Sequence, residues 1–118
     1  MSLNIVEKLI EGVTVLDLRG RITLGPETET LRTRVKRVLE DGRSRILLDL
    51  GEVNYIDSAG LSTLVACYTS ARRVGGELKL LRLTQHVHGL MHITRLSTVF
   101  EIYDTLSDAQ RSFKGAKG

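Results

Sequence analysis

Residues 45–83, which read RILLDLGEVNYIDSAGLSTLVACYTSARRVGGELKLLRL, decide the fold of this chain. Arg45 to Leu50 is a largely apolar run with hardly any alternation, which is typical of a strand covered on both faces. After a loop from Gly51 to Asp57, apolar residues recur at helical spacing until Gly75-Gly76, and Glu77 to Leu83 follows as a second strand. The order strand, helix, strand predicts a βαβ unit with parallel strands and a right-handed crossover.

Two β-rich runs and a helix are expected before this unit. Leu3 to Ile10 and Val13 to Arg19 are joined by Glu11-Gly12, a two-residue connection that is typical of an antiparallel hairpin. Pro26 suits the first turn of a helix, and apolar residues recur at helical spacing until Gly42.

Shorter elements are expected after residue 83. Thr84 should cap a short helix, Val99 to Tyr103 should form a last strand, and Ser107 should cap a C-terminal helix. Residues 114–118 are rich in Gly and Lys and are expected to form a flexible tail. The chain is therefore predicted to be one α/β domain over residues 1–113. We expect a mixed, mostly parallel β-sheet of about five strands, with the N-terminal antiparallel hairpin, packed with about four helices.

Composition bounds the class of protein. The chain has 118 residues, 42% of them hydrophobic and 26% charged, which fits one globular domain. The net charge is +3, but acidic and basic residues are interspersed, so we expect no direct nucleic-acid binding. No run approaches the ~18 apolar residues of a membrane span, no export signal is recognised, and a single cysteine fits a reducing compartment. We therefore expect a cytoplasmic protein without membrane insertion.

The carboxyl end of the central strand is the candidate site. Partners of open α/β sheets usually dock beyond the carboxyl ends of the strands, and Asp57-Ser58 falls there. Ser58 is at the predicted N-cap of the next helix, where its oxygen would accept hydrogen bonds from free backbone N–H groups. The same groups and the helix dipole would favour a phosphate on Ser58. Against a partner surface shaped for a neutral hydroxyl, that charge would be unfavourable, and Asp57 would add repulsion.

Spacing alone also fits a simpler interpretation, in which Ser58 is an ordinary helix cap worth about 1 kcal/mol and Gly60 lets the helix start close to the sheet. The wider sequence favours a functional role for Ser58 in addition to capping. Residues 54–61, NYIDSAGL, resemble the signature of STAS domains, the family of anti-sigma factor antagonists. Further pieces come in the order and spacing of that family, namely Arg19-Gly20-Arg21-Ile22, Ile46 to Leu50 and Gly75 to Leu78.

The resemblance implies a phosphorylation switch. In that family, the serine matching Ser58 is phosphorylated by an anti-sigma factor that is also a serine kinase with a histidine-kinase-like ATPase fold, and a serine phosphatase reverses the modification. The unphosphorylated protein binds the kinase and frees the sigma factor. By resemblance, Asp57 positions the serine and Gly60 permits close approach. The implied partner-binding residues are Arg21, Thr23, Asp57, Ser58, Ala59, Gly60 and Leu61.

The turn after the second β-rich run departs from the family pattern. It reads Gly20-Arg21-Ile22-Thr23-Leu24-Gly25, and Thr23 stands where the family often has an acidic residue. An acidic contact to the partner is therefore expected to be missing. A turn or capping role is the simpler interpretation of Thr23.

The histidines and the single cysteine do not indicate a metal site or a catalytic centre. His86, His88 and His92 fall in the helix after Thr84, but without a third ligand or a catalytic glutamate a solvated helix face is expected rather than a metal site. Cys67 lies mid-helix without oxyanion donors and is expected to be a small packed residue. No base, nucleophile and oxyanion site occur together, so we expect no enzyme activity, no metal and no cofactor.

Two alternative functions stay open. A STAS subunit of a phospholipid transporter or of a stress-sensing scaffold would use Ser58 to shape an interface without a phosphate cycle. A nucleotide-binding module or small enzyme is suggested by the basic balance and the crevice position. The sequence makes no prediction about the oligomeric state.

Overall fold

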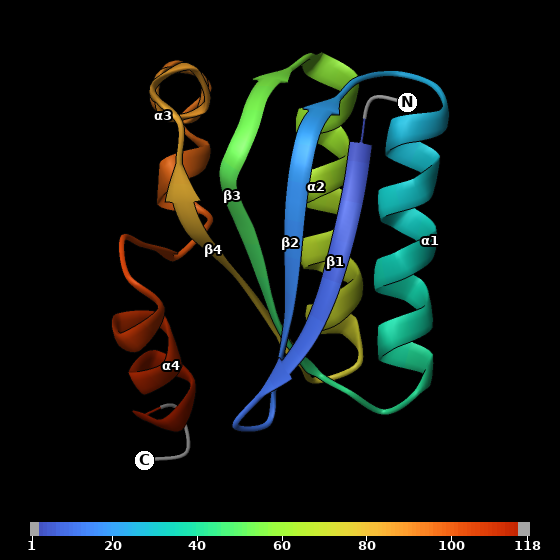
Figure 1. Ribbon diagram of the computed structural model, residues 1–118, viewed down its shortest axis with the longest axis vertical. Coiled ribbons are helices and arrows are strands. Elements are labelled where there is room, and N and C mark those ends of the chain that lie inside the picture. Colours follow the sequence, from blue (N-terminus) through green and yellow to red (C-terminus); the bar gives the residue numbers. More distant parts are fainter. Residues whose placement is uncertain (1–2, 116–118) are drawn as a thin grey trace.

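Within residues 3–115, the part of the chain that this computed structural model describes, five strands form one sheet and four α-helices pack against it (Figure 1). The strands are β1 (Leu3–Ile10), β2 (Val13–Ile22), β3 (Arg45–Ile56), β4 (Glu77–Leu83) and β5 (Ile102–Tyr103). The helices are α1 (Pro26–Glu40), α2 (Ser58–Arg73), α3 (Gln85–Ile93) and α4 (Leu106–Gly115), and a 3-10 turn, η1, covers Leu96–Thr98. The predicted fold class is confirmed.

The order of the strands in the sheet is the order in the sequence. β1 is antiparallel to β2, and every other neighbouring pair is parallel. β3 is central, since Leu48 lies between Leu16 of β2 and Leu80 of β4. All three side chains are fully buried, which explains why residues 45–50 show no polar alternation.

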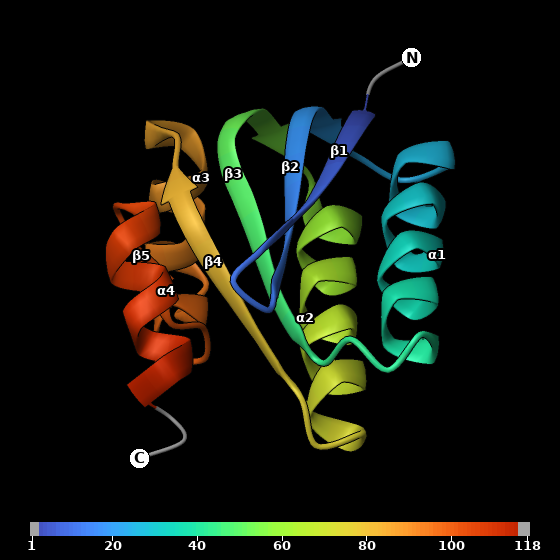
Figure 2. The same ribbon diagram turned by 60° about the horizontal axis from the view of Figure 1, so that its bottom comes forward.

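The sheet separates two hydrophobic cores. The larger core lies between the sheet and the helices α1, α2 and α3, and α1 and α2 run side by side against this face (Figure 2). Side chains alternate along a strand, so Leu47 points to the opposite face from its neighbour Leu48. On that opposite face, Leu47 packs with Ala109 and Phe113 of α4 in the smaller core.

β2 and β3 extend further than the sequence predicts. Residues 51–56 were expected in a loop because they include a glycine and polar side chains, yet they continue β3 to Ile56. The cause is pairing with the end of β2, where Arg19 lies opposite Glu52 and Ile22 lies opposite Ile56. Register shifts interrupt this pairing, so β3 bends as it approaches the site.

The C-terminal elements differ in detail from the prediction. Thr84 caps α3 as expected, with its hydroxyl oxygen 3.4 Å from the N–H of Val87. The last strand is only Ile102–Tyr103, because the residues before it form the 3-10 turn. Ser107 is not the cap of α4, which begins at Leu106; the hydroxyl oxygen of Thr105 instead accepts a hydrogen bond from the N–H of Asp108. α4 extends to Gly115, two residues into the predicted tail, and residues 116–118 lie outside the described part.

Replacing Phe113 tests whether α4 belongs to the folding unit. The ring is fully buried in the smaller core, with the Lys79 ammonium 4.6 Å from the ring centroid. We expect Phe113→Ala to lower the free energy of unfolding by about 3–5 kcal/mol in urea denaturation. Leu9→Ala is the control, because Leu9 is 65% exposed and its loss should change stability by less than about 0.5 kcal/mol. Equal effects of the two substitutions would contradict this packing.

Candidate functional site

The candidate site lies where two neighbouring parallel strands end. Because Ile22 and Ile56 are paired across β2 and β3, the chain leaves the sheet at the same edge after both strands. Thr23-Leu24 and Asp57-Ser58 therefore lie next to each other, although more than thirty residues separate them in sequence. The N-terminus of α2 begins at this edge (Figure 1).

Asp57, and not Ser58, is the N-cap of α2. Its backbone is extended, and its Oδ1 accepts a hydrogen bond from the N–H of Gly60 at 2.8 Å. The prediction that Ser58 caps the helix is therefore wrong, and Ser58 is the first helical residue. Aspartate and serine are equally good caps, so the sequence did not distinguish the two positions.

The second oxygen of the Asp57 carboxylate forms a hydrogen bond with the loop between β2 and α1. Oδ2 accepts a hydrogen bond from the N–H of Leu24 at 3.0 Å. This bond, followed by that from Gly60, lowers the pKa of Asp57 below its usual value, because both N–H groups favour the ionised carboxylate. We refer to this bridge between the β2–α1 loop and α2 as the Asp57 clamp.

Ser58 has an exposed side chain beside the clamp. Its hydroxyl has no hydrogen-bond partner among residues 3–115, so no contact of the fold depends on it. The first turn of α2 places this hydroxyl near the positive end of the helix dipole. The Asp57 carboxylate accepts from the N–H of Gly60 in that turn, and the Ser58 side chain is exposed to solvent.

Gly60 allows α2 to start against the backbone of β2. A Cβ atom at this position would lie 2.1 Å from the carbonyl oxygen of Ile22 and 2.7 Å from Cγ2 of Ile56. The close approach predicted for Gly60 is therefore an approach to the sheet. It sets the distance between Ser58 and the end of β2.

The other predicted site residues have different surroundings. Arg21 is exposed and lies opposite Tyr55 in the sheet, and Ala59 is half-buried. Thr23 is half-buried, and its hydroxyl donates to Oε1 of Glu27 at 3.4 Å, so it bonds within the turn that leads into α1. Leu61 was expected to contact a partner, but it is 8% exposed and packs in the larger core, where it holds α2 against the sheet.

Two features of this edge were missed in the sequence. Leu24 is 76% exposed while its N–H is held by Asp57, so an apolar side chain faces solvent next to Ser58. Tyr55 is 43% exposed and stacks on His86 of α3, with ring centroids 5.2 Å apart. Only the tertiary contacts identify these residues, because an exposed leucine or tyrosine carries no signal in a loop sequence.

The residues weighed for chemistry are Cys67 and the three histidines. Burial raises the pKa of the Cys67 thiol to about 12, so the thiol stays protonated at neutral pH. In the described part of the chain, no three His, Cys, Asp or Glu side chains are placed to hold a metal ion. Among the same residues, no helix combines the length and apolar character required to span a bilayer.

Comparison with known proteins assigns the family. The family model described as the STAS domain matches residues 4–109, and the chain belongs to this family. It is 31% identical to BtrV of Bordetella bronchiseptica over 107 residues, which cover 91% of each chain. It is 28% identical to the anti-sigma-B factor antagonist of Bacillus subtilis over 102 residues, or 86% of this chain and 92% of that protein. A crystal structure of TM1081 from Thermotoga maritima superposes with a TM-score of 0.82 at 25% identity, covering 92% of both chains.

Substitution of Gly60 tests the close approach of α2 to β2. We expect Gly60→Ala to lower the free energy of unfolding by at least about 2 kcal/mol, because the new methyl group meets rigid backbone. The matched control is Gly89→Ala in α3, where a Cβ would meet nothing within 4 Å. That substitution should stabilise the protein by about 0.5–1 kcal/mol through helix propensity. A neutral Gly60→Ala in thermal and urea unfolding would contradict the geometry.

The Asp57 clamp predicts a particular pH dependence. Its folded-state pKa lies below the ordinary value of about 3.9, so the stabilisation is present above that pH and is lost as the pH falls through the folded-state value. Asp57→Ala should therefore lower the urea midpoint at neutral pH, and the difference from wild type should shrink steadily in acid. Asp104→Ala, at an exposed aspartate without a hydrogen bond in the described region, should leave the midpoint nearly unchanged. A difference that is constant with pH would show that the ionised carboxylate is not responsible.

Proposed function

We propose that this chain is an anti-sigma factor antagonist whose binding is switched by phosphorylation of Ser58. In the unphosphorylated form it binds an anti-sigma factor that is a serine kinase with a histidine-kinase-like ATPase fold, and the sigma factor is released. The kinase phosphorylates Ser58, and a serine phosphatase restores the binding form. The observation that carries the proposal is an exposed hydroxyl beside the Asp57 clamp that has no hydrogen-bond partner in the part of the chain that the structure describes.

Family membership supports this assignment. The chain matches the STAS domain over nearly its whole length, and the relative from Bacillus subtilis that it covers to 92% is named an anti-sigma-B factor antagonist. The residues proposed to contact the partner surround Ser58 on the same edge, and they are Arg21, Thr23, Asp57, Ala59 and the backbone at Gly60. We add Leu24, because a large exposed apolar side chain next to a polar centre is typical of an interface anchor.

The clamp explains how a phosphate would act on binding and spare the fold. A phosphate adds a charge of about −1.5 to −2 to an exposed side chain, and the neighbouring Asp57 carboxylate already accepts from the N–H groups of Leu24 and Gly60. The phosphate would therefore stay at the surface, beside another negative charge. Because no hydrogen bond within residues 3–115 uses the Ser58 hydroxyl, the domain would keep its structure while its surface becomes more negative at this point.

The same geometry supports binding and not catalysis as the activity of the chain. The Cys67 thiol is protonated and buried, so it is not a nucleophile. At the edge around Ser58, the Asp57 carboxylate is already hydrogen-bonded to backbone N–H groups, which leaves the Ser58 hydroxyl as a group that a kinase would modify and not as one that would activate a substrate. Since sigma factors act on transcription, the proposed place of action is the cytoplasm. The partner is a protein, and no direct contact with nucleic acid is required.

Charge at Ser58 should decide capture of the partner. In pull-downs from a lysate of the native host, wild type and Ser58→Ala should retain a kinase of the stated fold, whereas Ser58→Asp should reduce its recovery at least about tenfold. Ser58→Asp should remain folded, because an aspartate in the first turn favours a helix. Ser70→Asp is the matched control, since it adds the same charge at an exposed position of the same helix.

Phosphopeptide mapping completes this test. With ATP, the captured kinase should place phosphate on Ser58 of the wild type and none on Ser58→Ala. Equal recovery with Ser58→Asp and Ser70→Asp, or phosphate only on another residue, would overturn the proposed switch. Retention of a membrane transporter subunit in place of a kinase would favour the alternative function of the family.

A further inference from the structure

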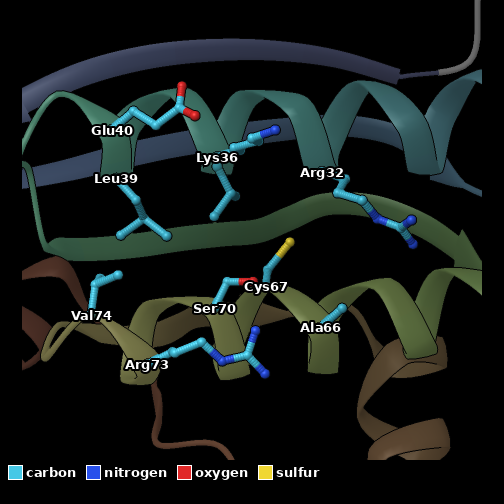
Figure 3. Close-up of a pocket in the computed structure, with 10 residues that line it drawn as sticks. Arg32, Lys36, Leu39, Glu40, Ala66, Cys67, Ser70, Arg73 and Val74 are labelled. Atoms are coloured by element: carbon cyan, nitrogen blue, oxygen red, sulfur yellow. The ribbon is translucent and has the colours of Figure 1, made fainter.

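A groove lies between α1 and α2, away from the edge that carries Ser58. It has a volume of about 430 Å³ and is lined by side chains from residues 32–40 of α1, from residues 66–73 of α2 and from Val74, which follows α2 (Figure 3). We call it the α1–α2 groove. Its lining starts eight residues after Ser58 along α2, which is about 12 Å at 1.5 Å per residue. It is therefore a separate site from the one proposed to bind the kinase.

The floor of the groove is apolar. Leu39 of α1 and Cys67 of α2 point into the gap between the helices, and Val74 closes one end (Figure 3). Val74 is 60% exposed, so the packing of the two helices leaves apolar surface uncovered at this end. Cys67 contributes as a small apolar surface, because its buried thiol does not ionise at neutral pH.

The rim of the groove is cationic. Arg32, Lys36 and Arg73 line it, and none of the three forms a salt bridge with any residue in the part of the chain that the structure describes. Glu40 is the one acidic residue of the lining, and its carboxylate points away from α2 (Figure 3). The charge of the rim therefore favours an anionic ligand over a cationic one.

We infer that the α1–α2 groove binds a single-chain anionic amphiphile, a carboxylate with an apolar tail of about ten carbons, whose head lies between the rim cations. The volume falls within the range of about 300–1,000 Å³ that is usual for small-molecule sites. The lined stretch of each helix covers about 12 Å, a length that an extended ten-carbon chain matches. The apolar floor accepts the tail and the unpaired guanidinium groups accept the head.

Titration with sodium decanoate below its micelle concentration tests this inference. We expect saturable binding in calorimetry, with methyl NMR shifts confined to Val35, Leu39 and Val74. Decyltrimethylammonium, which has the same chain and the opposite charge, should not saturate the protein. Ser58→Asp should bind decanoate like the wild type, so failure of the switch and failure of this site are distinguishable.

Matched variants define the contributions of the rim and the floor. Arg32→Gln and Arg73→Gln should each weaken decanoate about threefold, and Ser70→Leu, which fills the groove, about tenfold. Arg37→Gln removes the same charge from α1 outside the groove and should change affinity less than twofold, roughly. Circular dichroism and thermal unfolding confirm that each variant is folded.

Three results would overturn the inference. One is equal binding of the anionic and the cationic amphiphile, which would mean unspecific hydrophobic adsorption. Another is a set of NMR shifts outside the groove. The third is insensitivity of decanoate affinity to Ser70→Leu in a variant shown to be folded.

Discussion

The carboxylate of Asp57 joins the two loops on which the rest of the site depends. Oδ1 accepts a hydrogen bond from the N–H of Gly60 and caps the N-terminus of α2. Oδ2 accepts a hydrogen bond from the N–H of Leu24 in the loop after β2. These two bonds connect segments that the parallel pairing of β2 and β3 brings to the same edge. They add to a backbone hydrogen bond from the N–H of Asp57 to the carbonyl oxygen of Ile22, 3.4 Å away, which joins the same two segments.

The clamp acts together with steric contact at Gly60. The carboxylate caps the first turn of α2. The absence of a side chain at Gly60 lets this turn pack directly against the carbonyl oxygen of Ile22. This edge exposes the Ser58 hydroxyl, and no hydrogen bond among residues 3–115 uses it. Under the proposed switch, a change of charge at that atom would alter recognition with no need for a conformational change.

Helix α2 contributes to two surfaces of different polarity. Its N-terminus carries the polar edge with Asp57 and Ser58, and its C-terminal half forms one wall of the α1–α2 groove. Positive charge gathers at the groove because Arg32, Lys36 and Arg73 share that side of the two helices. No residue of the edge around Ser58 lines the groove. A phosphate on Ser58, as proposed, would therefore leave the lining of the groove unchanged.

The apolar pattern of the sequence alone determined the βαβ unit, the hairpin and the central position of residues 45–50, because burial on both faces excludes polar alternation. A strand end followed by a helix start also pointed to Asp57-Ser58 as the candidate site, but the spacing alone fitted an ordinary helix cap as well, and it was the resemblance of residues 54–61 to the STAS signature that favoured a functional role. Three things were decided only by tertiary structure. Residues 51–56 became strand because the end of β2 supplied hydrogen-bond partners. The carboxylate of Asp57 joined the cap of α2 to the loop after β2, because Leu24, remote in sequence, donates its N–H to the second oxygen. The groove formed because α1 and α2 lie side by side, an arrangement that depends on packing between distant segments and that local sequence does not encode.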